Sequence, residues 1–166
     1  MSDFEVVILM AVLAIPAIGL IWLVRRMRAP FRKRRDELAV ARYRERLAAP
    51  DFAAMEAHFG VELPAELKAF YRQPLLEKSA TLRLESGEWD IDSFEAIDGE
   101  SPREAWPGCE SYVAIANDGC GNRYLFDPKQ PGRGVFFHDH EIGEFPVVDS
   151  LRGFLMAIEA SEGWRE

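Results

Sequence analysis

The stretch Tyr112–Asp127, YVAIANDGCGNRYLFD, decides the fold of this chain. Tyr112–Ala116 and Arg123–Phe126 are short apolar runs bounded by turn residues, which is typical of buried strands. Between them, Asn117–Gly121 (NDGCG) is rich in residues that accept a positive φ, as tight turns require. The stretch therefore predicts an antiparallel pair of strands, and the rest of the chain can be placed around it.

Further strands are expected on both sides of this pair. Val135–His138 follows a loop rich in proline and glycine, and it predicts the next strand. Upstream, Thr81–Leu84 alternates weakly, Glu85–Glu88 is a turn, and Trp89–Ile97 resumes with aromatic and β-branched residues. Asp98–Gly108 reads as a loop. These segments together predict an antiparallel meander.

Three helices frame the meander. Asp51 can cap a first helix that ends at Gly60, and a second helix begins at Pro64 and ends at Pro74. A last helix covers Leu151–Ser161, capped by Asp149 or Ser150. The apolar faces of the three helices are formed by Phe52, Met55 and Phe59, by Leu67, Phe70 and Tyr71, and by Leu151, Phe154, Leu155 and Ile158. The predicted fold class is α+β, with two N-terminal helices, an antiparallel β meander and a C-terminal helix.

The N-terminus has a different character. Residues 4–24 are apolar except for Glu5 and would span about 31 Å as a helix, which matches the hydrocarbon core of a bilayer. A signal peptide has its positive charges before a shorter apolar core, and a buried core helix of this length usually keeps a polar face. The segment therefore predicts a single transmembrane helix. Because the basic residues follow it, the positive-inside rule places the N-terminus outside and the rest of the chain at the cytoplasmic face of the inner membrane.

Charge divides the remainder of the chain. Residues 25–46 carry ten Arg/Lys against three Asp/Glu, net +7, and residues 47–166 carry ten against 23, net −13. We expect residues 25–49 to form a basic helical stalk beside anionic lipid headgroups, and residues 50–162 to form one domain. A nucleic-acid partner is disfavoured, because the acidic domain repels phosphate. The basic residues expected to face lipid are Arg25, Arg26, Arg28, Arg32, Lys33, Arg34 and Arg35.

The acidity of the domain has two readings. It can serve solubility alone, or it can attract a basic protein partner and raise the rate of association. Under the second reading, the carboxylates of the strands and turns are the docking surface, with aromatic side chains as anchors. The residues expected to bind the partner are Asp90, Asp92, Trp106, Tyr112, Asp118, Asp127, Asp139 and Glu141.

Chemistry of other kinds has weaker support. If His138 and His140 lie on a strand, they share one face and could bind a metal with a cysteine, but the usual zinc spacings are absent. Cys120 beside one of these histidines could act as a nucleophile, although no spacing demands it. Acidic residues between Asp90 and Asp98 could act as acid and base, but a solvated strand face explains them equally. We expect no catalytic residues, no metal and no cofactor.

Five phrases of the chain, in this order, resemble the SUKH superfamily of Smi/Knr-like domains. They are Phe59–Tyr71 (FGVELPAELKAFY), Trp89–Ile97, Tyr112–Asp127, Gly134–Glu141 (GVFFHDHE) and Val147–Glu159 (VVDSLRGFLMAIE). The chain departs from the family pattern after the helix that begins at Pro64, where an Asn-Gly turn is usual and RQPLL stands instead. The N-terminal span also lies outside the domain.

The resemblance implies a binding module that is not an enzyme. Many bacterial members are implied to be immunity proteins that neutralise a toxin, often a nuclease, and fungal relatives act in cell-wall control. The leading hypothesis is therefore a membrane-tethered immunity protein whose partner is a basic toxin. The alternative is a scaffold or regulator of envelope processes at the membrane, and a Cys/His or metal-dependent enzyme is the third hypothesis.

Overall fold

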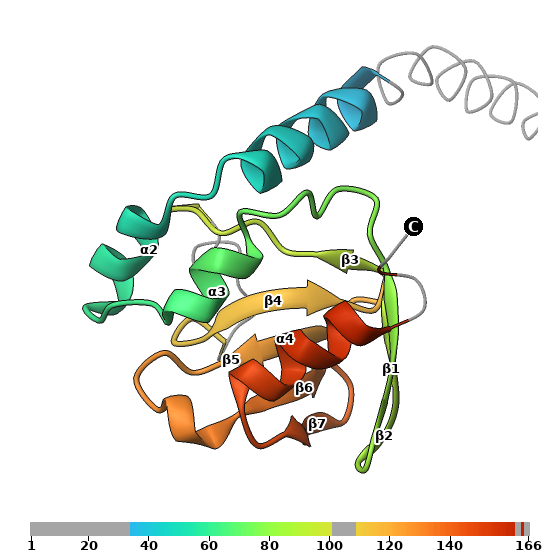
Figure 1. The fold of residues 1–166 in the computed structure, drawn as a ribbon. Helices are drawn as coiled ribbons and strands as arrows, with labels where there is room; N and C mark the ends of the chain where they lie inside the picture. Colours follow the sequence, from blue (N-terminus) through green and yellow to red (C-terminus); the bar gives the residue numbers. More distant parts are fainter. Residues whose placement is uncertain (1–33, 101–108, 162–163, 165–166) are drawn as a thin grey trace, which may run out of the picture. The chain divides into compact units, whose positions relative to one another are not determined.

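The structure is a computed structural model that describes residues 34–100, 109–161 and Trp164 (Figure 1). The chain divides into two compact units, Met1–Arg42 and Tyr43–Glu166. Of the first unit, residues 34–42 are described, and they are helical and exposed. All sheets and the core belong to the second unit.

The second unit begins inside the predicted stalk. Residues 43–48 are helical, and Leu47 is buried in the core with 4 % of its surface exposed. The Tyr43 hydroxyl donates a hydrogen bond to the Phe94 carbonyl at 2.6 Å, and the Arg46 guanidinium forms two hydrogen bonds with the Asp98 carboxylate. The compact domain therefore starts at Tyr43, seven residues before the start at 50 that the sequence indicated.

Two short helices follow. Helix α2 (Phe52–Phe59) is capped by Asp51, whose side chain accepts the Ala54 N–H, and it ends at Gly60 in the left-handed conformation. Helix α3 (Ala65–Phe70) starts after Pro64, and it ends before the expected Pro74. Met55 and Phe59 of α2 and Leu67 and Phe70 of α3 are buried as the sequence pattern predicted, and so is Tyr71 at the end of α3. Phe52 is only partly buried.

A five-stranded antiparallel meander forms the centre of the domain, in the order β3-β4-β5-β6-β7. Its strands are β3 (Ser93–Phe94), β4 (Val113–Asn117), β5 (Arg123–Phe126), β6 (Val135–Asp139) and β7 (Gly143–Val148). A short 3-10 helix, η2 (Pro131–Arg133), lies between β5 and β6. Strand β7 was not predicted, because Pro146 lacks the N–H that an inner strand needs and the segment is largely exposed. As the edge strand of this sheet, β7 tolerates both.

The two upstream strands form a separate hairpin. Strand β1 (Ala80–Leu84) pairs only with β2 (Gly87–Ile91), in register Ala80↔Ile91. The prediction of one strand over Trp89–Ile97 was wrong, because the chain leaves the hairpin at Asp92 and then joins the other sheet as β3. The Asp92 N–H donates to the Asn117 carbonyl at 2.8 Å, and this bond ties the crossing point to β4.

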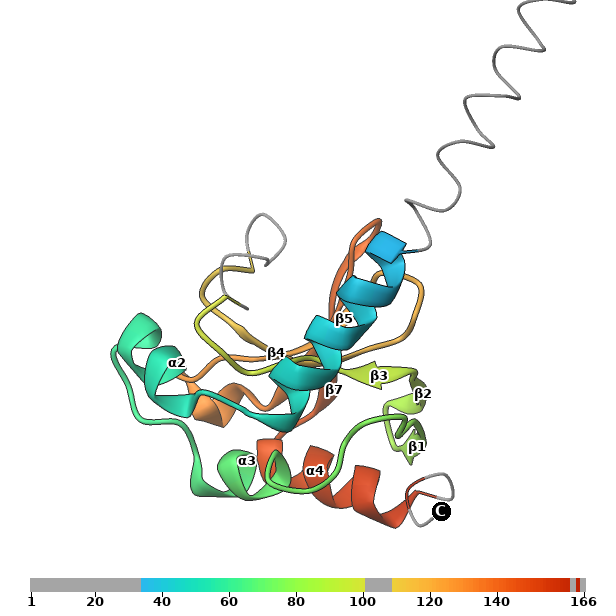
Figure 2. The ribbon, with the colours of Figure 1, turned by 90° about the horizontal axis from the view of Figure 1, so that it is seen from above.

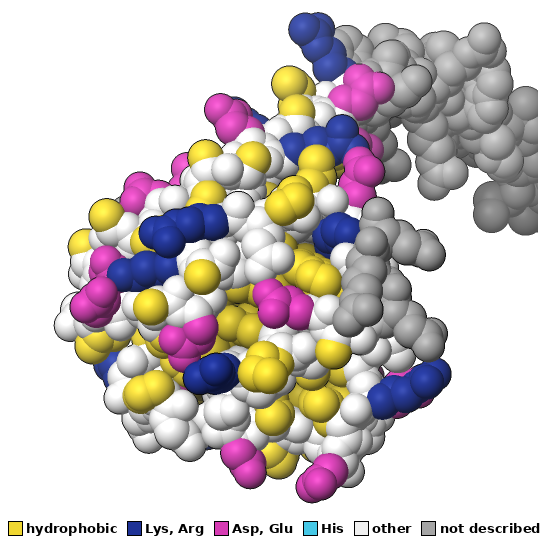
Figure 3. All heavy atoms as spheres, in the orientation of Figure 1, with side chains coloured by type: hydrophobic (Ala, Val, Ile, Leu, Met, Phe, Trp, Pro, Cys, Tyr) yellow, Lys and Arg dark blue, Asp and Glu magenta, His cyan; other side chains and the backbone are white. Residues whose placement is uncertain are grey.

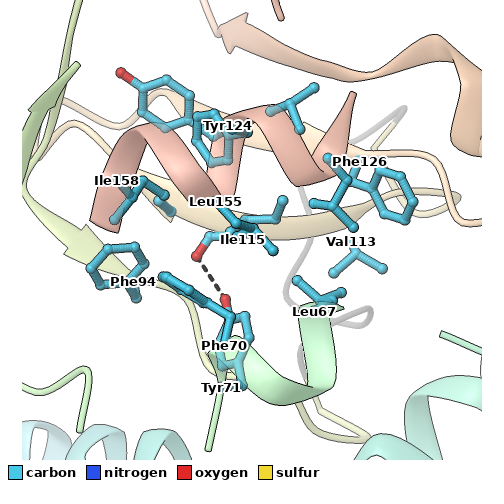
Figure 4. Packing of buried hydrophobic residues seen from close by; sticks show 14 of the residues in the cluster. Leu67, Phe70, Tyr71, Phe94, Val113, Ile115, Tyr124, Phe126, Leu155 and Ile158 are labelled. Atoms are coloured by element: carbon cyan, nitrogen blue, oxygen red, sulfur yellow. Dashed lines mark hydrogen bonds between the residues drawn. The ribbon is translucent and has the colours of Figure 1, made fainter. Parts of the chain in front are cut away.

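The main core lies on one side of the meander, where α3 and α4 (Leu151–Ala160) pack side by side (Figure 2). Figure 4 shows aromatic and branched side chains from the helices and the strands meeting there. The Tyr71 hydroxyl donates to the buried Ile115 carbonyl at 2.8 Å, and burial raises the pKa of this phenol well above its ordinary value. Each large apolar side chain buried here contributes about 1.5–3 kcal/mol.

A smaller cluster lies on the opposite face of the sheet. Along β5, Tyr124 and Phe126 belong to the main core, whereas Leu125 packs with Cys109 and Phe136. This alternation is the period of two that a strand imposes. Burial raises the pKa of the Cys109 thiol, with further contributions from the acidic residues nearby. Cys109 is therefore a packed, protonated side chain.

Candidate partner-binding surface

A cleft of about 730 Å³ lies between the β1–β2 hairpin and the C-terminal end of α4. Four of the described lining residues are acidic, namely Glu88 and Asp90 on β2, Asp92 at the crossing point and Asp118 in the β4–β5 turn, and one, Arg83, is basic. The Arg83 side chain lies 3.3 Å from Glu88, and both are largely exposed. The small residues Ala157 and Ala160 of α4 line the opposite wall. We call this region the acidic cleft.

The acidic cleft is supported from beneath by the core. The Tyr124 hydroxyl donates to the backbone carbonyl of Asp90 at 2.7 Å, while its ring packs against Phe154 of α4. Burial raises the pKa of Tyr124 far above its ordinary value, and the charges of Asp118 and Asp90 add to the effect. The Asp90 carboxylate accepts a hydrogen bond from the Thr81 hydroxyl at 2.8 Å. Strand β2 is therefore fixed to the core at the residue that lines the cleft.

Asp118 organises the turn between β4 and β5. Its Oδ1 atom accepts the N–H groups of Cys120 at 2.8 Å and Asn122 at 3.1 Å, and its Oδ2 atom accepts from the Asn122 amide at 2.7 Å. Gly119 and Gly121 both have positive φ, at 74° and 104°, as the turn composition predicted. The same side chain thus shapes the turn and lines the cleft.

A second turn, between β6 and β7, is fastened to the first. The Asp139 Oδ1 atom accepts the N–H groups of Glu141 and Ile142 at 2.8 and 3.2 Å. The Asn122 Oδ1 atom lies 2.7 Å from His140 Nδ1 and accepts the His140 backbone N–H at 3.2 Å. Because the Asn122 amide nitrogen already donates to Asp118, its oxygen is the acceptor and His140 Nδ1 carries a proton. Residues 117–122 and 139–142 are called the paired turns.

The structure brings together five of the eight predicted partner-binding residues. Asp90, Asp92 and Asp118 line the acidic cleft, and Asp139 and Glu141 lie in the paired turns. Gly119 packs closely against the Asp92 side chain, so the two regions adjoin. The acidic cleft and the paired turns therefore form one surface.

The other three predicted residues are placed differently. Asp127 is buried with 5 % exposed, and its carboxylate accepts the N–H groups of Lys129 and Gln130, so it closes the turn before η2. Tyr112 packs edge-on against Phe136 in the smaller cluster, on the face of the sheet opposite the main core. Trp106 lies outside the described residues.

Sequence reasoning missed Glu88 and the link between Asn122 and His140. Glu88 had been assigned to the turn, whereas the described turn is shorter and β2 already begins at Gly87. The link depends on the register Arg123↔His138 between β5 and β6, which brings the residues flanking each strand end together. A correct register for these two strands would have been the signal for it.

Of the residues considered for metal or nucleophilic chemistry, Cys120 and His140 lie in the paired turns, whereas His138 and Cys109 lie elsewhere. His138 lies on β6 opposite Arg123, whereas His140 lies beyond the strand end, so the condition for a shared strand face is not met. Cys120 is exposed in its turn, and Cys109 is buried in the smaller cluster. Within residues 34–100 and 109–161 and at Trp164, no group of three or more His, Cys, Asp or Glu side chains is placed to hold a metal ion.

The structure describes no residue of the predicted membrane segment. Residues 4–24 and the basic residues from Arg25 to Lys33 lie outside the described residues, while Arg34 and Arg35 are exposed on the first helical residues. Across the described part of the chain, no helix is both long and apolar enough to cross a bilayer.

Comparison with known protein families gives a match over most of the domain. The model of the SMI1 / KNR4 family (SUKH-1) matches residues 47–157. This range contains four of the five sequence segments on which the resemblance was based. It also contains nearly all of the fifth, Val147–Glu159. No curated protein and no solved structure matches the chain.

Proposed function

We propose that this chain, which belongs to the SMI1 / KNR4 family (SUKH-1), is a binding module without enzymatic activity. We propose further that its acidic surface holds a basic protein partner. The observation that carries this proposal is the union of the acidic cleft with the paired turns. Their carboxylates come from β2, the crossing point and two turns, and hydrogen bonds to backbone and side chains fix several of them. A prearranged acidic surface attracts a basic partner and loses little entropy when it binds.

The charge of the whole domain acts in the same direction. Residues 47–166 have 13 more acidic than basic side chains, since 23 Asp/Glu stand against ten Arg/Lys. Figure 3 shows that acidic and basic side chains are interspersed on the face that carries α3 and α4. The concentration of acids along the acidic cleft is therefore a local feature, which favours specific docking over general solubility.

The specific role that we propose is immunity against a basic toxin. Residues 4–24 would form the membrane span, and the basic residues after it would hold the domain at the cytoplasmic face by the positive-inside rule. A domain in that position would meet a toxin as it enters through the membrane. Family membership and the acidic surface support this role, and a membrane tether at residues 4–24 would determine where the protein acts.

The partner is tested by affinity capture with the full chain as bait, followed by purification of the captured protein and co-expression of the pair. We expect a protein with excess positive charge, inhibition of growth when it is expressed alone, and protection by this chain. Asp92→Lys should weaken binding and protection. Glu45→Lys makes the same change of charge on the exposed helical segment outside the acidic cleft, and it is the matched control. Capture of an acidic partner, or equal effects of the two variants, would refute the docking surface.

Envelope regulation is the competing function, and a deletion experiment separates the two. Loss of the gene in a culture without competitors should leave growth and envelope integrity unchanged if the role is immunity. Within the second unit, hydrogen bonds from Tyr43 to Phe94 and from Arg46 to Asp98 hold the last helical turn before residue 49, and a membrane scaffold could use the same contacts. An envelope defect in the deletion strain would therefore favour the scaffold.

Labelling of the Cys120 thiol can test on which side of the membrane the domain lies. This thiol is exposed, whereas Cys109 is buried, so a maleimide reagent that cannot cross membranes should react with one site. We expect no labelling in intact cells, labelling after the membrane is opened, and none in Cys120→Ser. Labelling in intact cells would place the domain on the outer side.

A further inference from the structure

The hairpin of β6 and β7 exposes two large apolar side chains. Ile142, in the turn, is 73 % exposed, and Phe145, on β7, is 38 % exposed. Single exposed apolar residues are common, but here two lie three positions apart on one short hairpin. In Figure 3 hydrophobic side chains gather in the lower middle of the view, where α4 and β7 lie in Figure 1.

The support beneath these side chains is rigid. Asp139 fixes the turn by accepting the N–H groups of Glu141 and Ile142, and the His140–Asn122 contact fastens it to the neighbouring turn. Phe145 lies opposite Phe137, and the Phe137 ring packs 5.1 Å from the Tyr124 ring. The strands of the hairpin are therefore held by packing against the core, and its turn is held by hydrogen bonds. An apolar side chain displayed in this way can bind without first being ordered.

The surroundings of the two side chains are acidic. Residues 139–148 contain three acidic residues, Asp139, Glu141 and Glu144, and no Lys or Arg. The Glu141 side chain is 78 % exposed. Glu144 lies opposite His138 on the other face of the sheet from Phe145, where Arg133 is 3.9 Å away. An apolar centre with a charged rim is the usual anatomy of a protein interface. Because this rim is negatively charged, it favours Lys or Arg side chains on the partner protein.

The outer edge of β7 is poorly suited to pairing with a partner strand. Pro146 has no N–H to donate, and the Val147 carbonyl already accepts the Ser86 hydroxyl at 2.6 Å. The Trp89 indole N–H in turn donates to the same hydroxyl at 3.0 Å. Recognition at this hairpin must therefore use side chains and not the addition of a strand.

We propose that Ile142, with Phe145 beside it, is the apolar anchor of the partner interface, and that its occupant is a basic amphipathic segment of a protein. Apolar side chains of that segment pack on Ile142 and Phe145 while its Lys and Arg residues reach Glu141. The inference rests on the proposed function, because it names the contact that the acidic surface alone does not supply. Charge would bring the partner to the surface, and the anchor would keep it there.

A displayed library of random peptides, selected against the full chain in zwitterionic detergent, supplies the probe. We expect the selected peptides to combine Lys or Arg with bulky apolar residues. With the synthesised peptides, Ile142→Ser should raise the dissociation constant about tenfold, as loss of a central anchor does. Met156→Ser removes an apolar side chain that is 58 % exposed on α4, and this control should change binding less than about twofold.

Three results separate this inference from the proposed function. Loss of binding in Ile142→Ser together with a weaker salt dependence in Glu141→Gln supports both. Basic peptides that lose binding with Asp92→Lys but not with Ile142→Ser overturn the anchor and leave the acidic docking surface standing. Selected peptides without excess positive charge overturn both. Unfolding curves of Ile142→Ser should match those of the parent chain, since the side chain is mostly in solvent.

Discussion

The main core and the paired turns are built on the same strands, yet different forces hold them. Tyr124 and Phe126 of β5 are held by burial against α3 and α4, with 1 % and 0 % of their surfaces exposed. Only a few residues away, Asn122 is held by directional hydrogen bonds to Asp118 on one side and to His140 on the other. Burial is non-directional and tolerates exchange of similar side chains, whereas a hydrogen-bonded turn depends on individual atoms. Substitutions in the core should therefore change mainly the free energy of unfolding, and substitutions on the surface should change mainly the binding of the partner.

The largest effect is expected from Phe154→Ala in the core. Phe154 is 0 % exposed and lies between α4 and the sheet, so truncation leaves a cavity and should lower the free energy of unfolding by about 3–5 kcal/mol. Denaturant unfolding measures it. Met156→Ala, two residues further along α4 and 58 % exposed, should change the free energy by less than about 0.5 kcal/mol. Similar values for the two variants would contradict the placement of α4.

The core was largely predictable from the sequence, for a reason that Phe154 illustrates. Leu151, Phe154, Leu155 and Ile158 follow the spacing of a helix that buries one face, and all four are buried in α4. Asp51 and Gly60 were recognised as the limits of α2 because their chemistry suits helix ends. Periodicity and capping are local, so a single sequence contains them.

The surface was predictable only in part, because it depends on contacts between distant segments. The sequence identified Asp90, Asp92 and Asp118 as exposed acids, but their convergence depends on where the chain leaves β2 for the other sheet. Asp127 looked equivalent to them and is instead buried in its own turn. Strand β7 was not predicted, because the segment around Pro146 lacks the alternation of apolar and polar residues that indicates a strand.

An intermediate effect is expected from Asn122→Ala in the paired turns. The side chain is 9 % exposed, and its removal leaves Asp118 Oδ2 and His140 Nδ1 without this partner. We expect the free energy of unfolding to fall by about 1–3 kcal/mol and amide exchange to quicken first in residues 139–142. Hydrogen exchange followed by mass spectrometry measures this. Uniform loss of protection, core included, would show that the turns and the core are not separable.

Tyr124→Phe tests the bond that joins the two regions. The ring stays in the core, while the hydrogen bond to the Asp90 carbonyl is lost, so the expected loss is about 1 kcal/mol at neutral pH. Burial raises the pKa of this phenol above its ordinary value of 10.0. The unfolded chain therefore releases the proton first, and stability that is complete below pH 10 should fall as the pH rises above it. Melting temperatures between pH 9 and pH 11 should fall less steeply in Tyr124→Phe, and an unchanged slope would contradict the role of burial.

The smallest effect on stability, and the sharpest test of the contrast, is expected from Asp92→Asn. The side chain is exposed at the rim of the acidic cleft, so the free energy of unfolding should change by less than about 0.5 kcal/mol. The association rate with a basic partner should nevertheless fall severalfold at low salt, and the difference should shrink as salt screens the charge. Stopped-flow kinetics with a selected basic peptide at two ionic strengths measures both. A change in the dissociation rate alone would mean that Asp92 makes a fixed contact, and the division between attraction by the acidic cleft and retention by the hairpin would then be wrong.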